Sequence, residues 1–298
     1  MSVPIAYLAV ILIWSTTPLG IVWSSETIHP TFAVLLRMII AVVPGWLILK
    51  AFRIELPWHK KARKLYSFSA IGIFGGMLFA YLAAGYISSG LMSLIFGLSP
   101  ILSGVLSQRI LAESALSFSK KVALSVAICG LAIVCFDKIS LADDAYIGII
   151  AVLMAVSFFS VSGVLVKSVE VAINPMATTV GSLLFSLPLF TVVWLIFDGS
   201  IPYESWSNKS ILSIVYLGVV GSLVGFIAYF YVLQRLKAST VALITMITPV
   251  IAISLGLILN NESVNTNLII GASAIIAGLA IYQWGDSLIK DNRKQYAQ

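Results

Sequence analysis

Ten apolar segments of about 20 residues follow one another along the chain, separated by polar stretches of at most about a dozen residues. A helix of about 20 residues rises about 30 Å, the thickness of a bilayer's hydrocarbon core. Because a helix satisfies its own backbone hydrogen bonds in lipid, we expect an all-α polytopic membrane protein. A soluble domain is excluded, since only 10% of the residues are charged, against about a quarter in soluble proteins. The expected transmembrane helices are 4–23, 31–50, 66–84, 90–110, 120–136, 146–166, 176–197, 210–233, 239–259 and 267–285.

The basic residues predict the orientation of these helices. Cytoplasmic loops of membrane proteins carry an excess of Lys and Arg. If the N-terminus is cytoplasmic, the outer loops contain only Lys138 and Lys209, and Arg37 lies inside a helix. We therefore expect both termini on the inner side of a bacterial cytoplasmic (inner) membrane. The basic residues then assigned to the inner side are Lys50, Arg53, Lys60, Lys61, Arg63, Lys64, Arg109, Lys120, Lys121, Lys167, Arg235, Lys237, Lys290, Arg293 and Lys294.

The two halves of the chain resemble each other. AVILIWSTTPLG (9–20) aligns with MAVSFFSVSGVL (154–165), and GLAI recurs at 130–133 and 278–281. Each half holds five predicted helices, an odd number, so the second copy must enter the membrane inverted. We assign one repeat to residues 1–140 and the other, with its basic tail, to 141–298. Inverted repeats are typical of secondary transporters, whose substrate site lies near the midplane between the repeats and is exposed by alternating access.

Glycine pairs mark the third and eighth predicted helices. Gly72 and Gly76 align with Gly221 and Gly225, and each pair lies on one helix face. Such spacing allows close helix approach. The pairs are interpreted either as fixed packing positions or as surfaces that slide during transport.

Two prolines also occupy equivalent positions. Pro100 and Pro249 follow Ser99 and Thr248 in the fourth and ninth predicted helices. Each proline leaves the carbonyl four residues earlier without its helical partner. Such a carbonyl is tolerated where it lines a cavity or meets a hydroxyl. The alternative is a simple kink.

Arg37 is the one formally charged residue well inside a predicted helix, and its repeat counterpart is Ser182. An arginine at mid-depth costs at least about 2.5 kcal/mol, so a compensating partner is expected. A substrate carboxylate or phosphate can bind the guanidinium bidentately. Carbonyls and hydroxyls of neighbouring helices, or snorkelling to the outer interface, are the alternatives.

Aromatic and hydroxyl residues at mid-helix positions complete the predicted substrate site. Aromatic rings can pack on apolar groups or hold an ammonium group by a cation–π contact. Ordinary core packing is the alternative for each ring. With Arg37, the candidate substrate-binding residues are Trp14, Ser15, Thr16, Tyr81, Ser99, Phe159, Ser160, Tyr229, Thr245 and Thr248.

Two acidic residues lie at helix ends, on opposite sides of the membrane. Glu113 follows the fourth predicted helix and Glu262 follows the ninth. We interpret both as helix caps or loop braces, with a proton relay as the alternative. Since no Asp, Glu or His lies at mid-helix, facilitated transport or exchange is the simpler expected mechanism.

These features together resemble the drug/metabolite transporter superfamily, specifically its EamA-type members. The likeness spans nearly the whole chain and rests on Trp14-Ser15, Arg37, the helix ends LAESALS and NNESVN, and the repeated GLAI. Ser15 departs from the Trp-Gly common in the family. The resemblance implies a cavity lined by helices 1, 3, 4, 6, 8 and 9, with helices 5 and 10 bracing each half. It also implies export or exchange of a small metabolite.

We expect the substrate to be an amino acid or a related compound. An organic-phosphate or nucleotide-sugar exchanger is the alternative, although it would need more cavity cations than Arg37. An intramembrane enzyme or a channel is a third class. The enzyme is disfavoured because His29 and His59 lie in loops on opposite sides, and no metal-ligand cluster is evident. No cofactor, metal or nucleic acid is expected. The expected partners are the metabolite, membrane lipids and a second copy of the chain in a homodimer.

Overall fold

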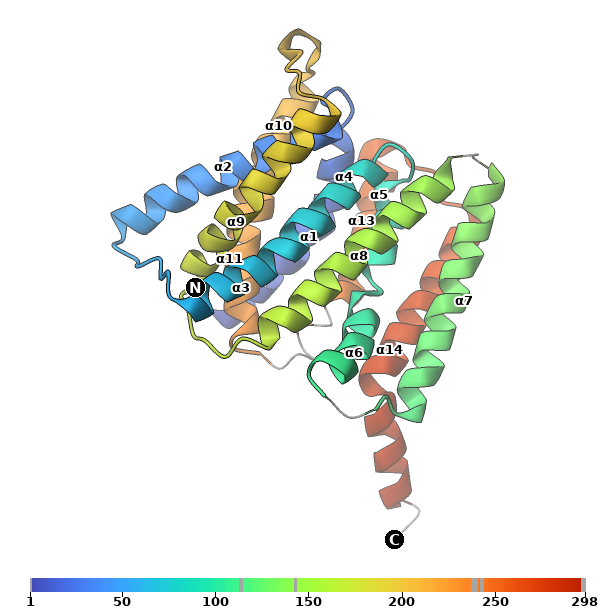
Figure 1. The fold of residues 1–298 in the computed structure, drawn as a ribbon. Coiled ribbons are helices and arrows are strands. Elements are labelled where there is room, and N and C mark those ends of the chain that lie inside the picture. Colours follow the sequence, from blue (N-terminus) through green and yellow to red (C-terminus); the bar gives the residue numbers. More distant parts are fainter. Residues whose placement is uncertain (1, 113–114, 142–143, 237–240, 242–243, 296–298) are drawn as a thin grey trace.

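The structure is a computed structural model that describes residues 2–112, 115–141, 144–236, 241 and 244–295, with side chains placed outside 135–141 and 287–295. Helices, joined by short connections, make up the described fold (Figure 1). They are α1 (Val3–Ser24), α2 (Pro30–Ala51), α3 (Lys60–Ile71), η1 (Gly72–Gly76), α4 (Met77–Ala83), α5 (Ser89–Phe96), α6 (Ser99–Ile110), α7 (Phe118–Leu141), α8 (Ala145–Lys167), α9 (Pro175–Phe197), η2 (Tyr203–Ser205), α10 (Asn208–Tyr216), η3 (Leu217–Val224), α11 (Gly225–Leu233), α13 (Ile244–Asn260) and α14 (Thr266–Gln295).

The all-α membrane fold predicted from the sequence is confirmed. Within the described residues, eight helical stretches are long and apolar enough to cross a membrane, and α13 is a shorter apolar helix. The eight are α1, α2, α3 to α4, α5 to α6, α8, α9, α10 to α11, and the Thr266–Asp286 part of α14. Helix α7 occupies the range of the fifth predicted helix. The count of ten crossings and the cytoplasmic placement of the termini stay predictions.

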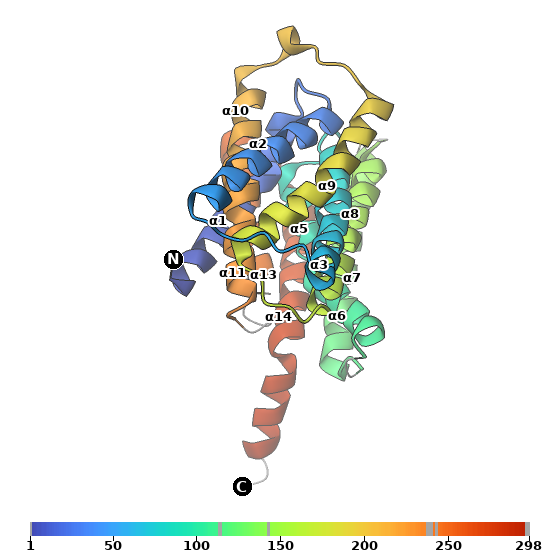
Figure 2. The same cartoon turned by 60° about the vertical axis from the view of Figure 1, so that its left-hand side comes forward.

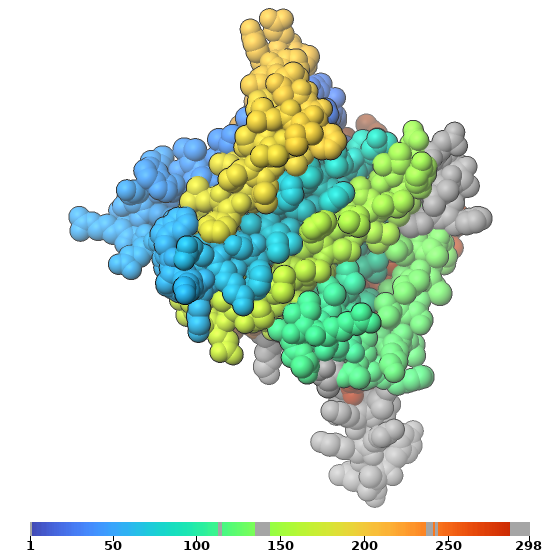
Figure 3. All heavy atoms as spheres, viewed as in Figure 1, coloured from blue at the N-terminus to red at the C-terminus, as the bar shows by residue number. Residues whose placement is uncertain are grey.

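Helices of the first half pack mainly on helices of the second half. Helix α2 lies against α9 and η3, and α1 lies against α13, α11 and α10. The third predicted helix, built from α3, η1 and α4, runs along α8. Figure 3 shows these last two elements lying side by side across one face of the molecule, with their side chains in close contact. The interface between the halves is therefore the core of the fold.

Helices α7 and α14 form a separate pair at one side of the bundle (Figures 1 and 2). The glycines of the two GLAI segments lie at their contact, where an ideal Cβ on Gly130 would lie 2.7 Å from the carbonyl of Gly271 and one on Gly278 would lie 2.9 Å from that of Ala123. The resemblance implied that the fifth and tenth helices brace each half. Among the described residues these two helices pack mainly on each other, because small residues on both allow the backbones to approach closely.

Two π-helical segments interrupt the bundle at equivalent places in the two halves. Segment η1 covers Gly72–Gly76, and η3 covers Leu217–Val224, which contains Gly221. A π-helical turn is rare and occurs frequently at functional sites. Gly72, Gly76 and Gly221 therefore lie in altered helix geometry, and Gly225 directly follows it.

The two equivalent prolines behave differently. The fourth predicted helix is broken between Phe96 and Ser99, and Pro100 lies in the first turn of α6. By contrast, Pro249 lies inside an uninterrupted α13. The break follows Gly97, whose repeat counterpart is Met246. Glycine weakens a helix interior, so the same proline signal produces a break in only one half.

Candidate functional site

Arg37 lies fully buried in α2 at the interface between the halves. Its Nε donates a hydrogen bond of 2.8 Å to the hydroxyl of Ser222 in η3. The guanidinium carbon lies 6.0 Å from the ring centroid of Tyr81 in α4, at the outer limit of a cation–π contact. An ideal Cβ on Gly221 would lie 3.3 Å from Nη2, so the glycine leaves room for the guanidinium.

The compensation of this charge is incomplete. Both terminal nitrogens of Arg37 are buried and have no hydrogen-bond partner among the described residues. The hydroxyl of Tyr81 is also buried and has no partner there. A buried donor without a partner costs about 1–3 kcal/mol, and more when it is charged. The protein thus holds, between its halves, a cation able to bind an additional acceptor.

Trp14 and Tyr229 form an aromatic pair about one helical turn from this cation along the facing helix. Their ring centroids lie 4.9 Å apart, with the rings tilted by 37°. An ideal Cβ on Gly225 would lie 3.7 Å from Nε1 of Trp14. Gly225 follows Gly221 by one helical turn, about 6 Å along the axis. The glycine pair of the eighth predicted helix therefore faces Arg37 at one residue and Trp14 at the other.

A second group lies where α6, α8 and η1 meet. The hydroxyls of Ser99 and Ser160 lie 3.3 Å apart, and Ser160 also donates to the carbonyl of Ser99 at 3.3 Å. The ring of Phe159 packs edge-on against Phe96, with centroids 5.8 Å apart. No direct contact joins this group to Arg37 among the described interactions. The predicted site residues are thus gathered into two groups.

The predicted hydroxyls of α1 bond to carbonyls of their own helix. Ser15 donates to the carbonyl of Ile11 at 2.7 Å. Thr16 donates to the carbonyl of Ile13 and lies 2.6 Å from the hydroxyl of Tyr216 in α10. In α13, Thr248 is buried and Thr245 is half-buried. Glu113 lies outside the described residues.

Glu262 forms a hydrogen-bond network that links the halves at the predicted outer ends of the helices. Its carboxylate accepts from the backbone N–H groups of Ser89 (3.0 Å) and Gly90 (3.2 Å) in the first turn of α5. It also accepts from the amide of Asn260, whose oxygen accepts from the indole of Trp23 at 2.8 Å. We call these five residues the outer network. A carboxylate at a helix N-terminus satisfies unpaired N–H groups and complements the helix dipole.

Further contacts between the halves lie at the same end of the bundle. Lys209 forms a 2.6 Å ion pair with Glu26. The hydroxyl of Ser210 donates to the carbonyl of Trp23 at 2.8 Å, and Thr27 donates to Ser210 at 3.0 Å. These contacts connect the α1–α2 loop to the start of α10 and so extend the link made by the outer network.

Sequence reasoning missed three of these polar partners: Ser222, Asn260 and the indole N–H of Trp23. Ser222 directly follows Gly221 inside an apolar helix, and this position was its only sequence signal. Asn260 and Trp23 lie at helix ends, where polar residues and tryptophan are common. Their pairing depends on the packing of segments more than 200 residues apart.

A metal ion in a site of this kind would need several His, Cys, Asp or Glu side chains close together. Among the residues that the structure describes, no three His, Cys, Asp or Glu side chains lie together in a way that could hold a metal ion. The chemistry that the two groups offer is therefore binding through a cation, hydroxyls and aromatic rings.

The fold and the site define a multi-pass integral membrane protein built from two helical repeats around a polar interface. Comparison with protein families gives the same result, since the EamA-like transporter family model matches residues 1–136 and again residues 146–283. The chain belongs to the EamA-like transporter family, as the sequence motifs predicted. The assignment of repeats to 1–140 and 141–298 stays a prediction in its exact boundaries.

Individual relatives match nearly the whole chain, and one of them is named as a transporter. The chain is 26% identical to the uncharacterized transporter YoaV of Bacillus subtilis, over 94% of this chain and 96% of that protein. It is 25% identical to the protein PagO of Salmonella typhimurium, over 94% and 92% of the two chains. A protein of known crystal structure has the same fold, with a TM-score of 0.66 and 20% identity over 95% of this chain and 97% of that chain.

Replacing Gly76 by alanine is expected to destabilise the protein. The added Cβ would overlap the ring of Phe159, which packs across the interface between the halves. Overpacking of this kind costs about 1–3 kcal/mol. Gly163→Ala is the matched control, because nothing lies within 4 Å of its ideal Cβ and alanine favours the helix. Thermal unfolding in detergent should give a lower Tm for Gly76→Ala and an unchanged or higher Tm for Gly163→Ala. Equal values for both variants would contradict the prediction.

Proposed function

We propose that this protein is a secondary transporter that moves a small polar metabolite, an amino acid or a related compound, across a bacterial cytoplasmic membrane. Both termini lie on the inner side, and the second five-helix repeat is inverted relative to the first. The substrate is exported or exchanged by alternating access at the interface between the repeats. Membership of the EamA-like transporter family supports the transport class.

The observation that carries the proposed substrate class is the unsatisfied guanidinium of Arg37. Its two terminal nitrogens are buried without partners between the halves. A carboxylate can accept from both nitrogens at once, and such charge-assisted pairs are the strong ones. The aromatic pair of Trp14 and Tyr229, one helical turn along the facing helix, can pack on an apolar group or hold an ammonium group. Together these groups suit an amino acid.

The inverted repeat and alternating access are supported by reciprocal contacts. The third predicted helix packs on α8 through Gly72 and Gly76, with ideal Cβ atoms crowding Ser162 and Phe159. The eighth packs on α1 through Gly225, whose ideal Cβ would lie 3.2 Å from Ile13. Gly72 and Gly76 thus face the first helix of the second repeat, and Gly225 faces the first helix of the first repeat. Such equivalence is expected when two copies of one unit exchange roles during transport.

The outer network and the Lys209–Glu26 ion pair join the halves at the predicted outer end. We assign this arrangement to a state that is closed toward the outside. A transporter in this state is ready to receive its substrate from the cytoplasm. Opening to the outside would then require Glu262 to release the first turn of α5.

The proposal is tested by thermal stabilisation of the purified protein with a panel of metabolites. The panel pairs each amino acid with its amide and its decarboxylated amine, and it includes sugar phosphates. We expect one or a few amino acids to raise Tm, while their amides and amines do not. Equal stabilisation by the amides would contradict a carboxylate contact. Stabilisation by sugar phosphates alone would favour the organic-phosphate exchanger.

Transport itself is measured with the stabilising compound in proteoliposomes. Preloading with unlabelled compound should accelerate the uptake of labelled compound, because exchange uses the same alternating site in both directions. Uptake that does not saturate would indicate a channel instead.

A further inference from the structure

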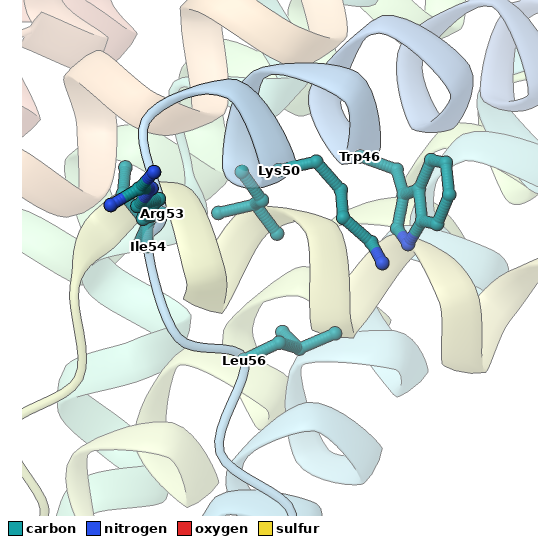
Figure 4. A pocket seen from close by; sticks show the side chains of 6 residues that line it. Trp46, Lys50, Arg53, Ile54 and Leu56 are labelled. Carbon is teal, nitrogen blue, oxygen red and sulfur yellow. The ribbon is translucent and has the colours of Figure 1, made fainter.

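A pocket of about 350 Å³ lies at the end of α2, where the chain turns toward α3 (Figure 4). Its lining combines two cations, Lys50 and Arg53, with one tryptophan and three aliphatic side chains. Figure 4 shows Lys50 beside Trp46, with Arg53 and Ile54 at the turn and Leu56 on the opposite side. This end of α2 is the predicted inner end, far from Arg37 and the outer network.

The turn that forms this pocket holds Arg53 in a costly conformation. Ile54 donates its N–H to the carbonyl of Leu49 (2.9 Å), and Arg53 donates to Lys50 (3.2 Å), the two bonds of a Schellman motif. The motif requires a left-handed residue after the cap, and Arg53 takes that place with φ +52°. Glycine is strongly favoured at this position. A strained non-glycine residue points to a use for its side chain.

The two cations of the pocket have no anionic partner among the described residues. Neither Lys50 nor Arg53 belongs to an ion pair, and the exposed Glu55 nearby pairs with neither of them. The Nζ of Lys50 lies 4.9 Å from the ring centroid of Trp46. Because the Schellman bonds occupy the carbonyls of Leu49 and Lys50, these oxygens compete less with an incoming anion for the donors of Lys50 and Arg53. The pocket is therefore free to bind a negatively charged group.

The surroundings of the pocket identify the source of that anion. Val43, Trp46 and Leu47 are exposed on the last turns of α2, and Trp46 also lines the pocket, so an apolar surface adjoins it. Tryptophan at a helix end marks the membrane interface. Basic pockets at the cytoplasmic interface bind anionic lipid headgroups. The aliphatic lining of Leu49, Ile54 and Leu56 suits the glycerol and upper acyl carbons of such a lipid.

We propose that Lys50 and Arg53 form a binding site for the phosphate of an anionic phospholipid, with Trp46 at the headgroup level. The phosphate lies between the ammonium and the guanidinium, and the acyl chains run along the exposed face of α2. Arg53 is retained at a position suited to glycine because its guanidinium binds this phosphate. The site is independent of the transported substrate.

The test compares thermal unfolding of the full chain in detergent with added phosphatidylglycerol or phosphatidylcholine. Phosphatidylglycerol should raise Tm of the wild type by at least about 3 °C more than phosphatidylcholine. The Lys50→Gln/Arg53→Gly variant should lose this difference without a lower Tm in detergent alone, since glycine relieves the strained turn. The Lys60→Gln/Lys61→Gln variant, with the same charge change on the same connection, should keep the difference.

Three outcomes would overturn the proposal. Equal stabilisation by the two lipids would show that binding does not depend on the negative charge of the headgroup. Equal loss in both double variants would assign the effect to the diffuse positive charge of the inner loops. If glycerol phosphate or inorganic phosphate stabilised the wild type as strongly as phosphatidylglycerol, the pocket would bind a free anion and not a lipid.

Discussion

Replacing Arg37 by glutamine is expected to weaken binding of the stabilising ligand by at least about 30-fold, while the ligand-free protein stays as stable as the wild type. Loss of one member of a buried charge pair costs about 2–5 kcal/mol, and 2 kcal/mol corresponds to about 30-fold in Kd. Without ligand, the substitution removes one hydrogen bond to Ser222 but also two buried nitrogens without partners. These effects oppose each other, so the net change in the free energy of unfolding should be small.

The measurement is a ligand titration followed by Tm, with two companion variants. Arg37→Lys keeps the charge but loses the planar guanidinium, which can bind a carboxylate through two nitrogens. This variant should therefore retain only part of the affinity for the ligand. Ser222→Ala leaves a third nitrogen of Arg37 without a partner, and should lower the free energy of unfolding by about 1–3 kcal/mol. The Arg37→Gln/Ser222→Ala double variant should recover most of that loss, since residues in contact are coupled. If Arg37→Gln lowered Tm without ligand and left the ligand shift unchanged, Arg37 would serve the scaffold alone.

Much of the fold followed from local sequence patterns. Each predicted helix range contains helix in the structure, because a 20-residue apolar segment has few alternatives in lipid. Arg37 was predicted from its neighbours to lie well inside a helix, with snorkelling to the outer interface as one alternative, and its side chain is fully buried. The glycine pairs were also predicted at close helix contacts, because a residue without a side chain lets two helix backbones approach each other.

The partners of these residues could not be predicted in the same way. Ser222 meets Arg37 across 185 residues, and Glu262 meets Ser89 across 173. Such pairs are set by how the two halves pack, which no local pattern encodes. Glu262 was interpreted as a helix cap or a loop brace, but its sequence position did not indicate the helix that it caps. It caps α5, in the opposite half of the chain. The π-helical segments were also beyond prediction, because glycine permits this geometry without requiring it.

Replacing Glu262 by alanine is expected to favour opening toward the outside, so that a cysteine placed at Ser89 reacts about 30-fold faster with a membrane-impermeant maleimide. Ser89 is fully buried, and its backbone N–H donates to the Glu262 carboxylate. The substitution removes the carboxyl acceptor of two N–H groups of α5 and of the amide of Asn260. Hydrogen bonds to charged groups contribute about 1.5–3 kcal/mol. Water replaces part of the lost hydrogen bonding. We therefore expect the free-energy difference between the closed and open states to change by about 2 kcal/mol, which raises the population of the open state roughly 30-fold.

The experiment uses Ser89→Cys in a chain whose Cys129 and Cys135 are replaced by alanine. Glu204→Ala is the matched control, because Glu204 is an exposed carboxylate at the same predicted outer end and takes part in no hydrogen bond of the outer network. It should leave the labelling rate unchanged. Glu26→Ala should have a small effect, since exposed ion pairs contribute about 0–1 kcal/mol. If Glu262→Ala lowered Tm but did not change the labelling rate, Glu262 would only cap α5. Faster labelling with accelerated exchange would instead identify release of this cap as the step that opens the site outward.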